Sequence, residues 1–184
     1  DGSKVAMWIY FVDQGSAKTL HDGTYAVEHG SYTHLWHTDT GQANGDPYMQ
    51  TRTAMENYVR VLEDNGCSLA DNCLRTWLFV HDIDNNYPGV VRARNDVFGQ
   101  YGLTNDTHFI ASTGINGSVG RQGVLLSMDT YAVRGLADGQ VRYLFAASHM
   151  NRTSDYGVSF ERGTAIEYGD RVHALISGTA SIDN

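Results

Sequence analysis

Two arginines and a tyrosine lie within eleven positions in the last quarter of the sequence. They are Arg152, Tyr156 and Arg162. A guanidinium can form paired, charge-assisted hydrogen bonds with a carboxylate, and a phenol adds a neutral donor. The spacing therefore predicts a site for a small dicarboxylate. The alternative is that Arg162 pairs with Glu161 or Asp170 on a solvated edge, where ion pairs contribute little to stability.

A run of small residues near the end of the chain is a second candidate. Gly178, Thr179, Ala180 and Ser181 can line a pocket with backbone N–H groups and hydroxyls, because small residues let a ligand approach closely. The same run equally fits a strand end whose small residues pack under a helix.

The histidines and cysteines do not predict a metal site. His34 and His37 are three positions apart, so their side chains point to opposite faces of a strand. Cys67 and Cys73 have no further ligands nearby, whereas zinc takes four, or three and a water. Hydrogen-bonded or surface histidines and two buried thiols are expected, although the cysteine spacing also permits a disulfide. No cofactor is predicted.

Ser112 has no base within reach in the sequence. His108 precedes it by four residues in the same predicted strand, which places the two about 13 Å apart. A nucleophilic serine needs its base at hydrogen-bond distance, so the sequence argues against a serine hydrolase triad.

Composition limits the class of protein and its partners. With 184 residues, 41% of them hydrophobic, the chain can form one domain and a piece of another. A net charge of -8 argues against a nucleic-acid partner. No apolar run approaches the length of about 18 residues that a membrane span needs, so a cytoplasmic location is expected. The first residue is Asp1 rather than Met, which is consistent with removal of a targeting segment.

The hydrophobic patterns predict an α+β fold, in which two helices pack on one face of a mixed sheet. One helix should begin at Pro47, capped by Asp46, and end at Asn65-Gly66; the other should run from residues 86–88 to Gly102. The predicted strands are 4–12, 24–27, 31–37, 73–81, 108–115, 123–133, 141–147 and 170–177. Residues 148–157 should form an irregular polar connector.

The predicted elements occur in an order that starts to repeat. Residues 48–134 read as helix, strand, helix, strand, strand, and a second such unit begins within 158–184. We therefore expect a first module over 1–134. Residues 135–184 should hold a connector and the first strands of a truncated second module, and the chain should be a fragment of a longer protein.

Several short motifs resemble the Rid (YjgF-like) superfamily over roughly residues 24–134. They are Gln50-Thr51-Arg52-Thr53, Asn65-Gly66-Cys67-Ser68-Leu69-Ala70-Asp71, Val80-His81-Asp82-Ile83 and Ile110-Ala111-Ser112-Thr113-Gly114-Ile115. The resemblance implies a mixed sheet with two helices on one face and assembly as a trimer. Typical members deaminate enamines and imines through an arginine that holds the substrate carboxylate. Ser112 occupies that position here, which argues against this activity but keeps Ser112 a candidate ligand contact.

The end of the chain resembles chorismatases, through Tyr156-Gly157-Val158-Ser159-Phe160-Glu161-Arg162 and Ser177-Gly178-Thr179-Ala180-Ser181-Ile182. These enzymes hydrolyse chorismate or eliminate its pyruvate. They carry two Rid-like modules, with a catalytic acid beyond the position of residue 184. The resemblance implies a module acting on chorismate or a similar small carboxylate, although whether this chain is itself an enzyme stays open. The alternatives are a non-catalytic assembly or small-molecule-binding domain and, less favoured, an enamine deaminase.

Two predicted strands, 4–12 and 73–81, are apolar or aromatic on both faces. In the second, alternation places Leu74, Leu78 and Val80 on one face and Arg75 and Trp77 on the other. The sheet face away from the helices would then expose a large apolar patch. We expect self-association through this face, as a trimer, unless residues 141–184 fold back and cover part of it.

Overall fold

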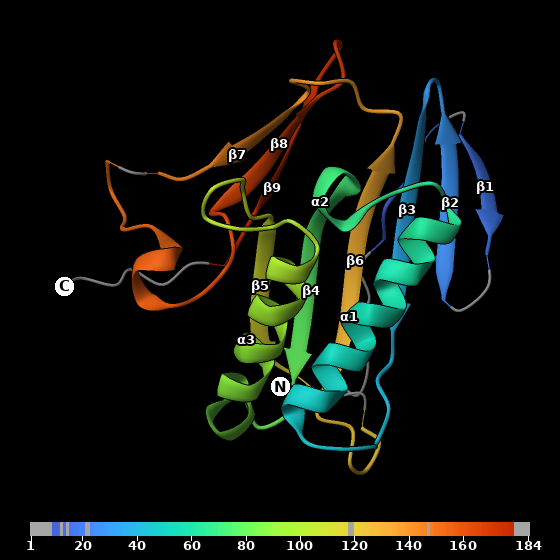
Figure 1. Cartoon of the computed structure of the whole chain (residues 1–184). Coiled ribbons are helices and arrows are strands. Elements are labelled where there is room, and N and C mark those ends of the chain that lie inside the picture. Colours follow the sequence, from blue (N-terminus) through green and yellow to red (C-terminus); the bar gives the residue numbers. More distant parts are fainter. Residues whose placement is uncertain are drawn as a thin grey trace.

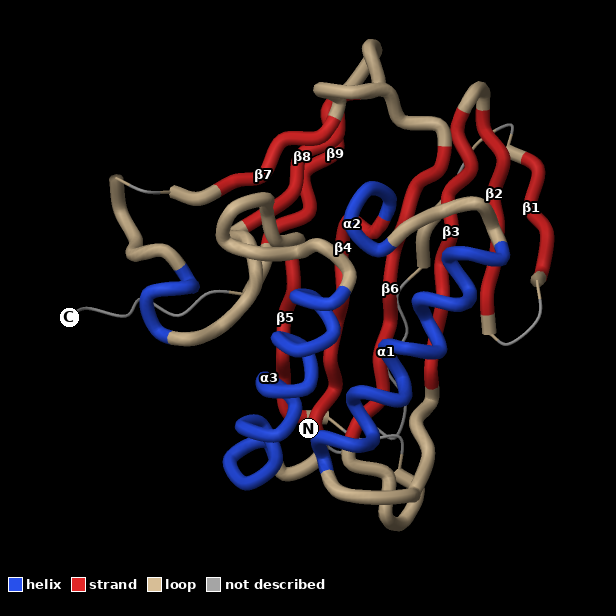
Figure 2. Tube along the Cα trace, viewed as in Figure 1, coloured by secondary structure: helices blue, strands red, loops and turns tan. Residues whose placement is uncertain are grey.

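The computed structural model describes residues 9–11, 13, 15–20, 23–117, 120–146 and 148–178. Figures 1 and 2 show a larger sheet, a smaller sheet and the helices. The elements are β1 (Ser16–Thr19), β2 (Thr24–His29), β3 (Tyr32–Asp39), α1 (Pro47–Asp64), α2 (Leu69–Asn72), β4 (Cys73–Val80), α3 (Ile83–Gln100), β5 (Ala111–Asn116), β6 (Leu126–Arg134), β7 (Val141–Leu144), the 3-10 turn η1 (Thr153–Tyr156), β8 (Gly163–Glu167) and β9 (Val172–Ile176). The predicted strand over 4–12 lies outside the described residues, apart from 9–11, which are not in a strand.

The larger sheet confirms the predicted α+β fold. Its strand order is β1-β2-β3-β6-β4-β5, and only β4 and β5 run parallel to each other. Helices α1 and α3 lie side by side on one face of this sheet (Figure 1). Helix α3 connects the two parallel strands, as a parallel pair requires.

Helix α1 begins where the sequence predicts. The Asp46 side chain accepts a hydrogen bond from the Met49 N–H at 2.8 Å, and Pro47 occupies the first helical position. The buried face of the helix packs against the sheet. Its residues include Met55, Tyr58, Val59 and Leu62.

The prediction for the start of α3 is wrong by one turn. The N–H groups of Asn85 and Asn86 both donate to the Asp82 carbonyl at 3.1 Å, so the helix is already formed before Pro88. Pro88 therefore lies inside the helix rather than at its first position. Asp82 takes a left-handed backbone conformation (φ 45°), and the chain turns there from β4 into the helix.

The predicted faces of β4 need one correction. The register with β6 shifts between Cys73 and Arg75, which is a β-bulge. Leu78 and Val80 pack beneath the helices as predicted, whereas Leu74 joins the cluster on the opposite face. The extra residue reverses the alternation that a regular strand would keep.

The smaller sheet, β7-β8-β9, packs on the face of the larger sheet that the helices leave free. Ile166 of β8 contacts a cluster formed by Leu74, Tyr131 and Val133. The C-terminal strands thus fold back over part of this face, which is the alternative to covering it by self-association. Strand β8 itself is absent from the predicted elements. The assignment of residues 135–184 to a second module stays a prediction.

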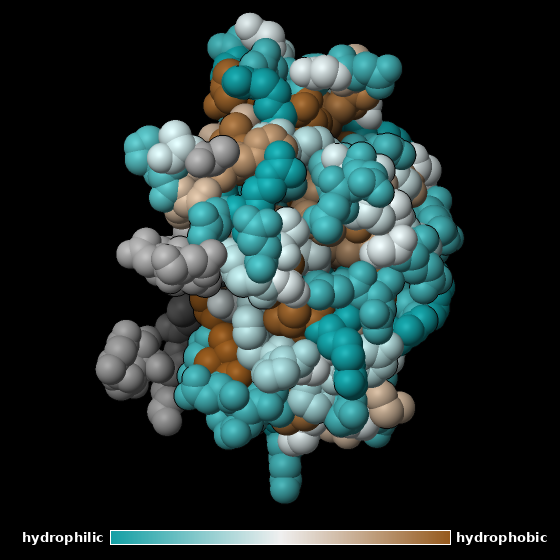
Figure 3. Space-filling view, turned by 60° about the vertical axis from the view of Figure 1, so that its left-hand side comes forward, coloured by the Kyte–Doolittle hydropathy of each residue, from teal (hydrophilic) through white to brown (hydrophobic). Residues whose placement is uncertain are grey.

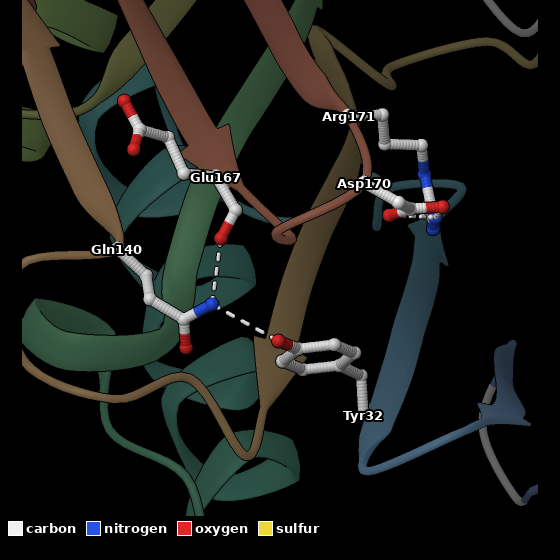
Figure 4. A network of polar contacts seen from close by, with 5 residues as sticks. All are labelled: Tyr32, Gln140, Glu167, Asp170 and Arg171. Atoms are coloured by element: carbon white, nitrogen blue, oxygen red, sulfur yellow. Dashed lines mark hydrogen bonds and ion pairs between the residues drawn. The ribbon is translucent and has the colours of Figure 1, made fainter.

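Polar contacts also join the two sheets. The Gln140 side-chain amide donates to the Tyr32 hydroxyl at 2.9 Å and to the Glu167 carbonyl at 2.6 Å. Figure 4 shows these bonds, with the exposed Asp170–Arg171 ion pair on the turn that precedes β9. Gln140 therefore connects β3 to β8 just before β7 begins.

The histidines and cysteines take the roles that the sequence favours. His34 Nδ1 lies 2.7 Å from the Tyr131 hydroxyl, and His37 Nδ1 lies 2.8 Å from Thr24 Oγ1. Cys67 and Cys73 are free and buried. Within the part of the chain that the structure describes, no group of three or more His, Cys, Asp or Glu is placed to hold a metal ion. None of the described helices is long and apolar enough to cross a membrane.

Candidate functional site

A cavity of about 260 Å³ lies near the start of β5, between the loop that follows α3 and the segment that carries η1. Its lining combines cationic, acidic, aromatic and hydroxyl side chains. The lining residues are Thr104, Asn105, Thr107, His108, Phe109, Phe145, Arg152, Thr153, Ser154, Glu161 and Arg162. The space-filling view in Figure 3 brings this side of the molecule forward, and its surface is mostly hydrophilic with small hydrophobic areas.

The edge of β5 holds the wall of the cavity in place. Glu161 donates its backbone N–H to the Ile110 carbonyl at 2.8 Å and forms a parallel bridge with Ala111. Its carbonyl accepts a hydrogen bond from the Ser177 hydroxyl. Residues on either side of position 161 are thereby fixed against the larger sheet, although they lie outside its regular strands.

Both predicted arginines line this cavity. The Arg152 guanidinium lies 5.2 Å from the Phe145 ring centroid, and Arg152 itself is exposed. Arg162 is only 6% exposed, and its Nη2 donates to the Asn151 carbonyl at 2.9 Å. Its Nε is buried and has no hydrogen-bond partner among the described residues. Two positive charges therefore border one small cavity.

The alternative pairing of Arg162 is wrong. Among the described ion pairs, Asp170 binds Arg171, and Arg162 pairs with neither Asp170 nor Glu161. Arg162 instead packs between aromatic rings, 5.5 Å from the Phe160 centroid and 5.8 Å from that of Tyr156. Tyr156 supports the arginine and does not line the cavity.

Glu161 is the acidic group of the cavity. It is 7% exposed, and its Oε1 accepts a hydrogen bond from the Phe109 N–H at 3.0 Å. Burial raises the pKa of the Glu161 carboxyl above its usual value, while the Phe109 N–H and the charges of His108 and Arg152 act in the opposite direction.

His108 contributes an imidazole to the same wall. Its Nδ1 lies 3.0 Å from the Phe109 carbonyl, which can only accept, so the proton is assigned to Nδ1. The ring stacks on Tyr143 with centroids 3.9 Å apart. Burial raises the pKa of Tyr143 to about 12, so the phenol stays neutral.

Ser112 and Gly178 are not among the residues that line the cavity. Ser112 is buried, and its hydroxyl accepts hydrogen bonds from Thr76 Oγ1 at 2.7 Å and from Arg94 Nη1 at 3.5 Å. The Gly178 N–H donates to Thr113 Oγ1 at 2.8 Å. Thr179, Ala180 and Ser181 lie outside the described residues. Ligand contacts by this set stay predictions.

Sequence reasoning did not select Glu161, His108 or Phe145 as site residues. The sequence indicates Glu161 as an ion-pair partner of Arg162, and it presents His108 as a possible base for Ser112. The bridge between Glu161 and Ala111 is a contact between positions far apart in the chain. No local pattern encodes it, so the sequence alone could not bring these residues together.

Comparison with known proteins supports the fold but does not identify the reaction. No family model matches the sequence, and no curated protein gives a significant match. A crystal structure of chorismatase matches at 20% identity with a TM-score of 0.59, over 90% of this chain and 50% of that one. The chain thus spans about half the length of that protein.

Two further solved structures match a smaller share of the chain. A protein from Salmonella typhimurium matches at 15% identity and a TM-score of 0.50, over 66% of this chain and 98% of its own. A member of the YjgF/YER057c/UK114 family from Mycobacterium tuberculosis matches at 23% identity and a TM-score of 0.46, over 58% of this chain and 82% of its own. The matches at a TM-score of 0.50 or more, to chorismatase and to the Salmonella typhimurium protein, show the fold that the Rid resemblance implies. The likeness to chorismatase extends over most of the length of the chain.

Proposed function

We propose that this chain is a Rid-like module that binds a small carboxylate in the cavity bordered by Arg152 and Arg162. The observation that carries the proposal is the placement of these two guanidiniums at one cavity, where neither forms an ion pair with a described carboxylate. Glu161 is the one acidic group among the described lining residues, so a carboxylate ligand would balance the second positive charge. Buried or half-buried guanidiniums are the groups that bind such ligands most specifically in proteins.

The dimensions of the cavity suit a small ligand. A volume of about 260 Å³ lies just below the usual range for drug-sized molecules, and Phe109 and Phe145 provide apolar surface for a ring. Chorismate and similar cyclic carboxylates meet both requirements. Chorismate itself is proposed because the chorismatase structure matches 90% of the chain. The proposal concerns binding of the ligand by a module of a chorismatase-like enzyme. It assigns no catalytic groups to this chain.

Isothermal titration calorimetry tests the proposal with chorismate and 3-hydroxybenzoate as probes. The unmodified chain should bind at least one of them saturably. Arg152→Gln should weaken binding roughly tenfold to a hundredfold, because one charge-assisted contact is lost. Arg152 is exposed, so this variant should fold normally.

Arg142→Gln is the matched control. Arg142 pairs with Glu167 on the surface of the smaller sheet, away from the cavity, and carries the same charge. Its substitution should leave the affinity within about twofold. Equal losses of affinity in both variants would point to a general charge effect. If neither chorismate nor 3-hydroxybenzoate binds, the proposed function is contradicted.

A non-catalytic assembly domain is the second candidate. It is favoured by a separate apolar hollow of about 540 Å³ on the face away from the helices, which includes Ile9, Tyr10, Phe11 and Tyr25. These four side chains are all at least 43% exposed. Enamine deamination is disfavoured, because the buried hydroxyl of Ser112 replaces the carboxylate-binding arginine of the Rid pattern.

A further inference from the structure

The carboxylate of Glu161 is unusual within an anion-binding cavity. Oε1 is occupied by the Phe109 N–H, but Oε2 has no hydrogen-bond partner among the described residues. The backbone of Glu161 is held on both sides, by the Ile110 carbonyl and by the Ser177 hydroxyl. The side chain is thus a fixed acceptor that cannot easily turn away from a ligand.

A fixed acceptor beside two arginines imposes a specific requirement on the ligand. An ionised Glu161 repels a second anionic group of the ligand. It accepts a hydrogen bond from a hydroxyl or ammonium group, which favours ligands that carry such a donor. A site built to accept such a bond discriminates against analogues without the donor, because its acceptor would be left unpaired on binding.

We infer that Glu161 is a specificity-determining residue that selects carboxylates carrying a hydrogen-bond donor. This inference rests on the proposed function. The ligand class is a small, ring-bearing hydroxy- or amino-carboxylate. Its carboxylate lies toward Arg152 and Arg162, and its donor lies toward Glu161 Oε2. Phe145, stacked on Arg152 at the rim, contacts the ring.

The neighbouring imidazole does not replace this acceptor. His108 donates through Nδ1 to the Phe109 carbonyl, so its remaining acceptor is Nε2, which carries no negative charge in the neutral ring. The hydroxyls of Thr153 and Ser154 also line the cavity, but the Thr153 hydroxyl donates to the Phe160 carbonyl at 2.5 Å. Glu161 is accordingly the strongest acceptor among the lining side chains, since it alone carries a negative charge.

The test compares benzoate with its 2-, 3- and 4-hydroxy derivatives by calorimetry at mildly alkaline pH. The unmodified chain should bind at least one hydroxybenzoate about tenfold more tightly than benzoate, as expected for one hydrogen bond to a charged group. In Glu161→Gln this preference should fall to about twofold or less, while benzoate should bind several-fold more tightly because the repelling charge is gone.

Glu63→Gln is the matched control, because it removes the same charge from an exposed position on α1. It should keep the hydroxyl preference unchanged, and thermal melting should show that both variants are folded. Equal binding of benzoate and every hydroxybenzoate would overturn the role of Glu161 and leave the carboxylate site standing. An unchanged preference in Glu161→Gln would do the same. Binding of none of the four compounds would overturn the role of Glu161, whereas the proposed function fails only if chorismate does not bind either.

Discussion

Several arginine side chains are buried in this molecule. Arg75, Arg94 and Arg162 are each at most 6% exposed, and none forms an ion pair with a described carboxylate. Burial lowers the pKa of Arg75 to about 10, and it lowers the pKa of Arg94 as well. Arg75 donates to the hydroxyls of Thr113 and Ser177, which are neutral. These cations therefore carry a desolvation cost without a paired charge.

We predict that Arg94→Met raises the free energy of unfolding by about 1–3 kcal/mol, or leaves it unchanged. Nε and Nη2 are buried without a hydrogen bond of good geometry to the described residues, and the contact with Tyr87 offsets the cost of burial only in part, since the pKa of Arg94 is lowered. An apolar side chain of similar length removes that cost. Urea denaturation measures the change. Arg92→Met, on the exposed side of the same helix, should stay within about 0.5 kcal/mol. If Arg94→Met instead lowers the free energy of unfolding by more than about 2 kcal/mol, the interactions of the guanidinium outweigh its cost of burial.

The sequence groups Arg152 and Arg162 as candidate carboxylate contacts, because guanidiniums bind carboxylates. Both line one cavity, and their binding of a ligand stays a prediction. Their surroundings could not be predicted, because Glu161 reaches the site through a bridge to the edge of β5. The residue type indicates which chemistry a side chain can perform. The neighbours of that side chain in the folded structure depend on contacts between distant parts of the chain.

At the scale of elements, local sequence patterns predict some helices and strands and miss others. Local patterns sufficed for α1, since Asp46 and Pro47 are strong start signals. They failed for β8, because Gly163 and Thr164 give a weak strand pattern and the strand is defined by its partners on both sides. They also failed at the bulge before Arg75, which depends on the register with β6.

We predict that Ile166→Ala lowers the free energy of unfolding by roughly 2–5 kcal/mol. Ile166 is 0% exposed between the two sheets, so truncation loses apolar burial and leaves a void. Ile176→Ala, on the adjacent strand β9, is the control: Ile176 is 62% exposed and should change stability by less than about 1 kcal/mol. Similar small effects in both variants would show that the smaller sheet does not pack on the larger one.

The interface between the sheets should also make stability depend on pH. Burial, with nearby positive charge, lowers the pKa of His34 from 6.5 to about 4. The unfolded chain then binds more protons than the folded chain between these values. Stability is fully present above about pH 6.5 and falls by up to roughly 3 kcal/mol as the pH drops toward 4.

Denaturation at a series of pH values checks this prediction. His34→Gln should flatten the slope between pH 6.5 and 4, whereas His81→Gln, at an exposed position, should keep it. Burial also lowers the pKa of His173, so a smaller slope should remain in the first variant. An identical slope in His34→Gln and the unmodified chain would contradict the assignment to His34.

At the scale of the whole molecule, the face away from the helices is only partly covered. The smaller sheet packs over Tyr131 and Val133, but Tyr25 on β2 remains 55% exposed beside Ile9 and Phe11. The expectation of a trimer came from the Rid resemblance and from the apolar character of this face. We propose that self-association uses the uncovered part around Tyr25.

Light scattering over a range of concentrations tests the assembly. The mass should exceed the 20.3 kDa of one chain, and Tyr25→Glu should shift it toward the monomer. Met49→Glu, on α1 and 57% exposed, should not change the mass. A monomeric mass at every concentration, up to the high micromolar range, would contradict self-association.

The most direct test of the central claim is a crystal structure of this chain with 3-hydroxybenzoate bound. The account predicts the ligand in the cavity beside β5, with its carboxylate at hydrogen-bond distance from the guanidinium of Arg152 or Arg162. An ordered ligand elsewhere, such as the apolar hollow around Tyr25, would contradict the account. So would an empty cavity in crystals grown at saturating ligand.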